Sequence, residues 1–532
     1  MILLTSLLLL ACQEPVQEGA PEAAPVFLDT PVYRGYPAQD AVRYSIALQV
    51  LSDGGYSGSV DYLFEALEPL DRIRLDATAD KDWKLRFEDA SGTLEVVRHE
   101  HSIEVLLPAP VDAGAEVQFR LHFTGEPADG LYRERNTYGA TFLFTDHFTS
   151  RARGWLPCED ANADRAQFET TLSVPPGWDA VGAGEWQRVE HPEGAAPGKT
   201  FHGLTKQDIP PSLYAFAAGP FLRVPEDGDP RLQAHYVFPQ DLELATASLV
   251  HHTEWMEIME STFGPYAYAK YTTVQIPTRW GGMEYPGNVW LAQELFRYPG
   301  GGVGTLAHEF AHMWFGDAVG YAQWEDAWLS EGFASYFGPW LYEKSGGPAL
   351  AEQMGRARSG WARSKKARET PIRWMNYRKS DDFFSRVSAN TYSKGAWVLH
   401  MLRQEVGDEA FFAGVKVYYL DFYGQAVDSK ALQVSMEKVT GEDLDWFFTQ
   451  WLDRAGAPQL QVRDEKGALV LTQLQEADPF RFKLRVSWSD SDGLPQEKTF
   501  AITERVTTLP LGEDTSDWKL DPRTELLFLE AR

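Results

Sequence analysis

The stretch "TLAHEFAHMWFGD", Thr305 to Asp317, is the strongest constraint that the sequence places on the fold of this chain. Its two histidines, His308 and His312, are four residues apart, so on a helix they share one face. Apolar residues flank them, which indicates a buried helix. Buried imidazole and carboxylate groups need polar partners. Two interpretations follow: the pair binds a metal ion, or two ordinary histidines lie on a half-buried helix.

An acid further along the chain favours the metal. Eighteen residues separate His312 from Glu331, which lies inside the apolar segment "WEDAWLSEGFASYFGPWLY". That spacing leaves room for a loop and a returning helix, which would bring the carboxylate back to the two histidines. A set of two histidines and one glutamate leaves the fourth position of a zinc ion open, as catalytic zinc sites do. The sequence therefore predicts one zinc ion held by His308, His312 and Glu331.

Length and charge limit the class of protein. The 532 residues are 44% hydrophobic and 24% charged, which is a globular composition long enough for two to four domains. The formal net charge of −28 makes the chain a polyanion that repels phosphate backbones. We therefore expect no nucleic-acid partner.

Hydrophobic periodicity divides the chain into three parts. Residues 31–225 are mostly strand-like, with period-two alternation in segments such as "VQFRLHF". Residues 226–455 have helical spacing, and "GAWVLHMLRQEVGDEAFFAGVKVYYLDF" predicts two helices that break at Gly407. Residues 456–532 are strand-like again, and "RFKLRVSW" places Phe482, Leu484, Val486 and Trp488 on one face. The expected fold is a multidomain α+β protein.

The first residues predict export. "MILLTSLLLLAC", residues 1–12, is shorter than the roughly 20 apolar residues that span a bilayer and is typical of a secretory signal. Its ending resembles the bacterial lipoprotein cleavage box, which implies a lipid on Cys12. The alternative is a simple cleaved signal with a chance cysteine. Residues 13–30 are rich in proline and glutamate and predict a solvated tether. The expected location is the bacterial cell envelope, where the N-terminal lipid alone would attach the protein to a membrane. Gln13 favours the outer membrane. The alternative location is outside the cell, after secretion.

Five ordered segments carry a family resemblance. In chain order they are "RARGWLPCEDANADRAQFETTLSVP", "IPPSLYAFAAGPF", "GGMEYPG", HExxH followed after eighteen intervening residues by the glutamate of "WLSEGFASYF", and "NTYSKGAWVLHML". Together they resemble the aminopeptidase N family of gluzincin zinc metallopeptidases. The resemblance implies a saddle-like N-terminal β-sheet domain, a thermolysin-like helical catalytic domain and a small C-terminal β domain.

The resemblance also implies roles for single residues. Glu309 would be the general base for a zinc-activated water, and Tyr392 would stabilise the oxyanion. Glu284 would bind the free N-terminal ammonium of a peptide substrate. The residues before it would let the peptide lie along this strand, because the two glycines permit close backbone approach; these residues are Gly281, Gly282 and Met283.

Two positions depart from the family pattern. Tyr285 stands where the family motif ends in asparagine, and Phe148 stands at or near the place where many members carry a second amine ligand. Asp146 or His147 are alternatives that spacing does not favour. Three functions therefore stay open. The leading one is a zinc aminopeptidase; the others are a zinc endopeptidase with a relaxed amine requirement and a non-catalytic peptide-binding lipoprotein.

Overall fold

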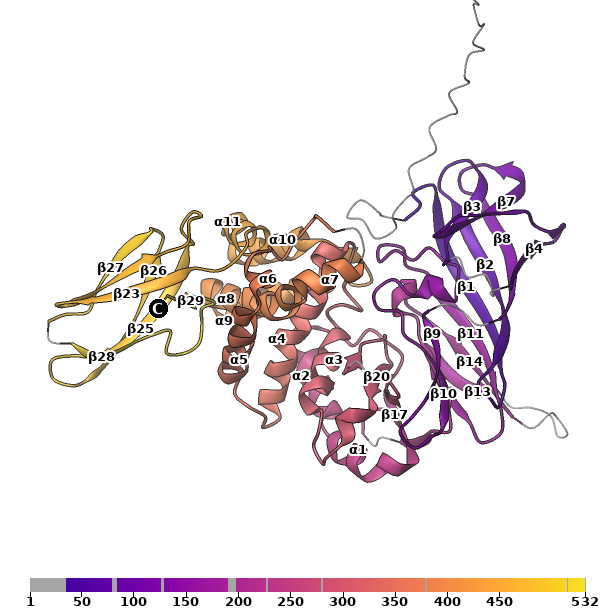
Figure 1. The fold of residues 1–532 in the computed structure, drawn as a ribbon, viewed down its shortest axis with the longest axis horizontal. Coiled ribbons are helices and arrows are strands. Elements are labelled where there is room, and N and C mark those ends of the chain that lie inside the picture. Colours follow the sequence, from indigo (N-terminus) through magenta and orange to yellow (C-terminus); the bar gives the residue numbers. More distant parts are fainter. Residues whose placement is uncertain are drawn as a thin grey trace, which may run out of the picture.

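The computed structural model describes residues 35–78, 84–125, 129–189, 198–225, 228–278, 281–377, 380–513 and 515–531. The predicted signal with Cys12 and the whole predicted tether, residues 13–30, lie outside the described residues. An N-terminal β part, a mainly helical part and a C-terminal β part follow one another along the long axis of the molecule (Figure 1). The predicted multidomain α+β fold is confirmed.

An eight-stranded mixed sheet forms most of the N-terminal β part. In spatial order its strands are β13 (Glu185–Val189), β14 (Lys199–Leu204), β11 (Gln167–Val174), β1 (Gln39–Val50), β2 (Tyr56–Ala66), β8 (Glu116–Thr124), β4 (Lys84–Asp89) and β5 (Gly92–Thr93). Buried and exposed side chains alternate along β8, the strand that "VQFRLHF" predicts. Only β1 and β11 pair in parallel; the other described pairs of this sheet are antiparallel.

Two smaller sheets complete this part. One contains β3 (Leu70–Asp76), β7 (Ser102–Val111) and β6 (Val96–Arg98). The other contains β12 (Asp179–Gly182), β15 (Phe216–Gly219), β10 (Thr141–Thr145) and β9 (Leu131–Arg135). Strand β10 ends directly before Asp146, so it aims the residues after it at the helical part.

The helical part begins with a five-stranded sheet. Its order is β16 (Leu222–Pro225), β17 (Leu232–Val237), β18 (Tyr271–Ile276), β20 (Val289–Ala292) and β19 (Gly282–Met283). The edge strand β19 is antiparallel to β20, and its two residues come from the "GGMEYPG" motif.

The described residues of this part form eleven α-helices. They are α1 (Leu242–Ser248), α2 (His252–Phe263), α3 (Val303–His312), α4 (Trp328–Lys344), α5 (Leu350–Arg363), α6 (Lys365–Arg368), α7 (Ser380–Ala389), α8 (Gly395–Val406), α9 (Asp408–Asp421), α10 (Ser429–Thr440) and α11 (Asp445–Phe448). π-helical turns cover Asn390–Lys394 and Thr449–Asp453, and the short strands β21 (Gly320–Tyr321) and β22 (Ala426–Val427) pair in parallel. Gly407 separates α8 from α9 with a φ of +85°, as the sequence predicts.

The C-terminal β part consists of two small sheets. One contains β27 (Val506–Pro510), β24 (Ala468–Gln473), β23 (Gln459–Glu465) and β29 (Leu529–Glu530); the other contains β26 (Pro495–Ile502), β25 (Phe482–Ser489) and β28 (Ser516–Leu520). Leu484 and Val486 of β25 are fully buried, and the apolar core continues without interruption into the helices. Arg358 of α5 fixes the contact with an ion pair of 2.6 Å to Asp521.

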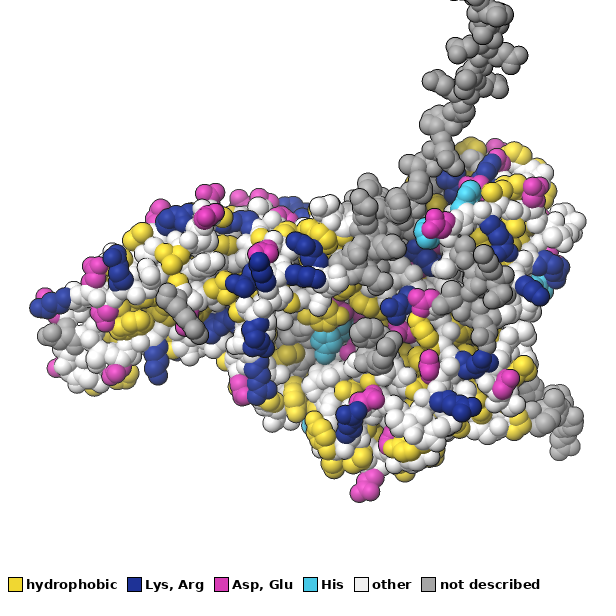
Figure 2. Space-filling model, in the orientation of Figure 1, with side chains coloured by type: hydrophobic (Ala, Val, Ile, Leu, Met, Phe, Trp, Pro, Cys, Tyr) yellow, Lys and Arg dark blue, Asp and Glu magenta, His cyan; other side chains and the backbone are white. Residues whose placement is uncertain are grey.

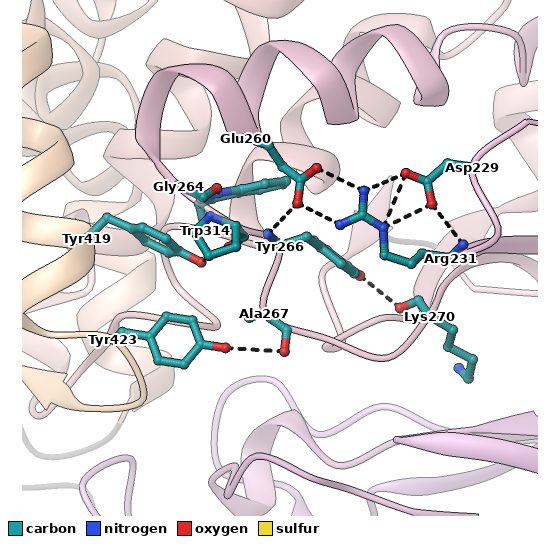
Figure 3. Close-up of polar contacts among 11 residues, drawn as sticks. Asp229, Arg231, Glu260, Gly264, Tyr266, Ala267, Lys270, Trp314, Tyr419 and Tyr423 are labelled. Carbon is teal, nitrogen blue, oxygen red and sulfur yellow. Dashed lines mark hydrogen bonds and ion pairs between the residues drawn. The ribbon is translucent and has the colours of Figure 1, made fainter.

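A polar network holds the loop between α2 and β18 against the end of α3 (Figure 3). Glu260 of α2 pairs with Arg231 at 2.6 Å and accepts the backbone N–H of Tyr266 at 2.8 Å. Trp314, two residues after α3, donates to the carbonyl of Gly264 at 3.0 Å. The end of the helix that carries the two histidines is therefore tied to its neighbours by directed hydrogen bonds as well as by apolar packing.

Among the described residues, no helix has both the length and the apolar character needed to cross a membrane.

Candidate metal centre

Helix α3 carries both histidines and is buried as its apolar flanks predict. His308 and His312 are one turn apart, and α4 packs against α3. The two helices approach closely at Gly338 of α4, where an added Cβ would stand 2.7 Å from the Cα of His308. Since real Cβ contacts are almost never this short, only glycine lets α4 come near enough to present Glu331 to the histidines.

Three donor atoms converge between α3 and α4. Nε2 of His308 and Nε2 of His312 are 3.2 Å apart. Glu331 Oε2 lies 3.3 Å from the first nitrogen and 3.4 Å from the second. Ligand atoms at tetrahedral zinc distances stand about 3.3–3.6 Å from one another. The three side chains therefore fit a single tetrahedral ion, and the predicted trio is brought together.

The second nitrogen of His312 is also fixed. His312 Nδ1 lies 3.2 Å from the carbonyl oxygen of Phe315 and 3.0 Å from the hydroxyl of Ser330. A carbonyl only accepts, so a proton on Nδ1 leaves the Nε2 lone pair free for a metal. A Cβ at Gly316 would stand 2.9 Å from Nδ1, so glycine is needed there. No sequence pattern pointed to Ser330, because its contact with His312 depends on how α4 packs against α3.

Tyr392 meets the other oxygen of Glu331. Its hydroxyl donates to Glu331 Oε1 at 2.6 Å, although 61 residues separate the two in sequence. The π-helical turn before α8 carries Tyr392. Close contact between Gly332 of α4 and Gly395 of α8 brings the turn near, since a Cβ on Gly332 would lie 2.9 Å from the Cα of Gly395.

Two further carboxylates lie beside His312. One oxygen each of Glu284 and Glu309 and one nitrogen of His312 all lie within 4.8 Å of one another. Glu309 is 4% exposed and Glu284 is 7% exposed. A Cβ on Gly282 would displace the Glu309 carboxylate from its present position, so the glycine leaves room for this carboxylate under the strand β19.

The centre has a surplus of buried negative charge. Burial raises the pKa of Glu309 well above its ordinary value, and it raises the pKa of Glu284 as well. For His312, burial acts in the opposite direction, but the carboxylates of Glu284, Glu331 and Glu309 outweigh it and raise the pKa to about 10. A cluster of this charge needs a cation, and a divalent ion at the three converging donors would supply it.

A cavity of about 710 Å³ opens from this cluster towards the N-terminal β part. Figure 2 shows histidine and acidic side chains at the bottom of a hollow between the two parts. The predicted site residues Gly281, Gly282, Met283, Glu284 and Tyr392 line the cavity together with the three converging donor residues and Glu309. The N-terminal β part contributes Asp146, Phe148 and Arg151.

The two positions that depart from the family pattern have different surroundings: Phe148 lines the cavity, whereas Tyr285 is buried. Phe148 lines the cavity and packs edge-on against Phe384, with 4.8 Å between ring centroids. Tyr285 is fully buried, and its hydroxyl accepts the backbone N–H of His147 at 2.8 Å. His147 is buried too, and Trp155 donates to it at 2.7 Å. Asp146, which spacing alone did not favour as the second amine ligand, lines the cavity together with Phe148.

The sequence was compared with the models of known protein families. Residues 247–451 match the sequence model of the peptidase family M1 domain. This segment of the chain is therefore similar to an M1 peptidase domain. It runs from the end of α1 into the π-helical turn after α11, so it contains all three converging donors, Glu309, Glu284 and Tyr392.

The relatives of this chain are distant in sequence but align with much of it. It is 27% identical over 431 residues to tricorn protease-interacting factor F2 of Thermoplasma acidophilum, which covers 76% of the chain and 52% of the relative. It is 27% identical over 359 residues to aminopeptidase N of Streptomyces lividans, which covers 62% of the chain and 40% of the relative. The chain thus spans about half the length of these relatives, or less.

A solved structure shares the fold. An M1 zinc metallopeptidase of Deinococcus radiodurans, determined with a Tyr-Ser-Ala substrate, superposes with a TM-score of 0.66 at 24% sequence identity. The match covers 80% of this chain and 97% of that one. At this identity the likeness shows the architecture: an N-terminal β part, a helical part and further strands in one chain.

Proposed function

We propose that this protein is a zinc-dependent aminopeptidase that removes N-terminal residues from peptides. The observation that carries the proposal is the convergence of His308, His312 and Glu331 within 3.4 Å of one another at the bottom of a cavity. The same cavity is lined by a buried acid suited to proton transfer and by further acids suited to an ammonium group.

One zinc ion would be held by His308, His312 and Glu331. When bound, zinc lowers the pKa of a coordinated water and polarises a carbonyl. The M1 domain match and the donor chemistry, two imidazoles and a carboxylate with an open side towards the cavity, support this assignment.

Glu309 would act as the general base. Its carboxylate is buried, lines the cavity and stands within 4.8 Å of a donor atom of His312. Its raised pKa lets the carboxyl group take a proton from water and return it to the leaving amine. The glycine at position 282 keeps the approach to this carboxylate open.

Tyr392 would stabilise the developing oxyanion. Its hydroxyl donates to Glu331 Oε1 and lines the cavity, so it can turn by rotation of the phenolic O–H towards a substrate oxygen. Burial raises the pKa of Tyr392 well above its usual value. The phenol therefore stays protonated and remains a donor.

Glu284 and Asp146 would bind the substrate ammonium from two sides. Glu284 belongs to the helical part and Asp146 to the N-terminal β part, and both line the cavity. The charge of Asp146 contributes to the raised pKa of Glu284, so the two carboxylates interact. Two acids that disfavour each other's charge favour a cation between them.

A pair of peptides tests the proposal. Cleavage of a peptide with a free N-terminus but not of its N-acetylated twin, abolished by a chelator and restored by zinc, is the expected result. Equal cleavage of both twins would instead identify an endopeptidase. A zinc-loaded protein that cleaves neither would identify a peptide-binding protein without catalysis.

A further inference from the structure

A second cavity, of about 260 Å³, lies where the N-terminal β part meets the five-stranded sheet of the helical part. Strands β12, β13 and β14 form one side, and β16, β17 and the start of β18 form the other. It shares no lining residue with the cavity of the metal centre. It is therefore a separate compartment.

Basic side chains converge on this cavity from four segments. Its cationic lining residues are Arg188, Lys199, Arg223 and Lys270, and its one acidic lining residue is Asp179. The chain as a whole has a formal net charge of −28, so a surplus of cations in one small cavity runs against its general charge. Because low-dielectric walls concentrate the field of such a group, the cavity attracts anions.

Lys270 is the buried member of the group. It is 2% exposed, and its ammonium donates to the carbonyl of Gly287 at 3.4 Å and to the side chain of Asn288. Both acceptors are neutral, and no described carboxylate pairs with it. An ammonium has three N–H donors, so one remains for a ligand. Burial lowers the pKa of Lys270 to about 7, and a bound anion would restore the charged form.

The two arginines keep most of their donors available. Arg223 makes one hydrogen bond of 3.5 Å to the carbonyl of Gln233 and lies beside the hydroxyl of Tyr236. Neither Arg188 nor Arg223 forms an ion pair with a described residue. Lys199, by contrast, pairs with Asp179 at 3.3 Å, which neutralises one cation within the cavity. The remaining guanidinium groups have the planar donor geometry that suits oxyanions.

We propose that this cavity binds a small oxyanion with two negative charges, of the phosphate or dicarboxylate class. Arg188 and Arg223 would hold it from the two sides of the cavity, and Lys270 would hold it from the bottom. The volume is at the small end for ligand sites and admits a small anion rather than a large molecule. This inference concerns a different cavity and does not depend on the proposed peptidase activity.

Calorimetric titration of the zinc-loaded full chain at low ionic strength tests the proposal. Inorganic phosphate and succinate are the two probes, and they separate the phosphate class from the dicarboxylate class. We expect saturable binding of at least one probe, weakened at least tenfold in Arg188→Gln/Arg223→Gln. The double variant Lys416→Gln/Lys466→Gln removes the same charge from exposed positions elsewhere, and it should bind like the wild type.

Lys270→Met provides a second, independent variant. It should also weaken binding at least tenfold, and its thermal transition without any anion shows whether the protein still folds. Failure of both probes to bind would overturn the proposal. So would binding that survives the double arginine substitution, because such binding belongs to another site.

Discussion

The hydroxyl of Tyr392 lies 2.6 Å from Glu331 Oε1, while the other oxygen of that carboxylate meets the two histidines. One carboxylate thus joins the proposed oxyanion donor to the proposed metal.

Tyr392→Phe removes the donor but keeps the ring. We expect kcat to fall about 10²–10³-fold, as for loss of one oxyanion donor, with zinc content unchanged. Steady-state kinetics and metal analysis check this, with the exposed Tyr298→Phe as the control; undiminished turnover would remove Tyr392 from the mechanism.

Glu309→Gln separates metal binding from proton transfer. The amide has the size of the carboxylate but cannot accept a proton, so we expect activity to fall by about 10²–10⁴-fold while the protein still binds zinc. Glu257→Gln on the exposed face of α2 is the matched control. If the purified Glu309→Gln protein cleaves peptides at the wild-type rate, Glu309 is not the base.

Chelation should reveal how strongly the metal supports the fold. Removing zinc leaves the buried carboxylates around His312 without a divalent cation, and ligand linkage then lowers stability. We expect the thermal transition to fall on chelation and to recover when zinc is added back. Glu331→Gln should show little of this difference, because it lacks one ligand. A transition that ignores chelator in the wild type would mean that no structural metal is bound.

Gly338→Ala tests the close approach of α3 and α4. The added methyl would meet the Cα of His308 at 2.7 Å, so the helices must separate. We expect a loss of about 1–3 kcal/mol in stability, typical of overpacking, together with weaker zinc binding. Gly360→Ala in α5 has nothing within 4 Å and should stabilise the helix by about 0.5–1 kcal/mol. Denaturant titration of both variants gives the comparison, and equal effects would contradict the packing argument.

The raised pKa of Asp146 leads us to expect that kcat/KM depends on pH. Burial raises its pKa to about 6, so the carboxylate is mostly ionised at pH 7 and mostly neutral at pH 5. Since only the ionised form attracts the substrate ammonium, kcat/KM should fall about tenfold over this interval. Asp146→Asn should have a lower kcat/KM at pH 7 and should lack this part of the pH dependence. A variant with the full wild-type pH profile would exclude Asp146 from amine binding.

Local spacing was enough to predict that His308, His312 and Glu331 lie together. An interval of four residues places His308 and His312 on one helix face whatever surrounds the helix, because the α-helical repeat is fixed by backbone geometry. The return of Glu331 needed only a second helix after a loop. The strand periodicity of "VQFRLHF" and the break at Gly407 were predictable for the same reason, since both depend on neighbours within a few residues.

Contacts between distant segments could not be read in this way. The contact of Tyr392 with Glu331, the support of His312 by Ser330 and the entry of Asp146 into the cavity all depend on how separate elements pack. Spacing favoured the position of Phe148 over that of Asp146, because a residue interval says nothing about where a side chain points. In the structure, the chain after β10 turns both Asp146 and Phe148 towards the cavity.

The sequence by itself therefore determined which donor groups can meet: two imidazoles at helical spacing, a carboxylate on the next helix, and the acid Glu309 beside the first imidazole. The tertiary structure alone decided which polar groups surround that chemistry. Gly338 and Gly332 illustrate the physical reason, since each is required only because the backbone of another helix passes within van der Waals distance. Such distances between elements arise from the packing of the whole core, which no local pattern encodes.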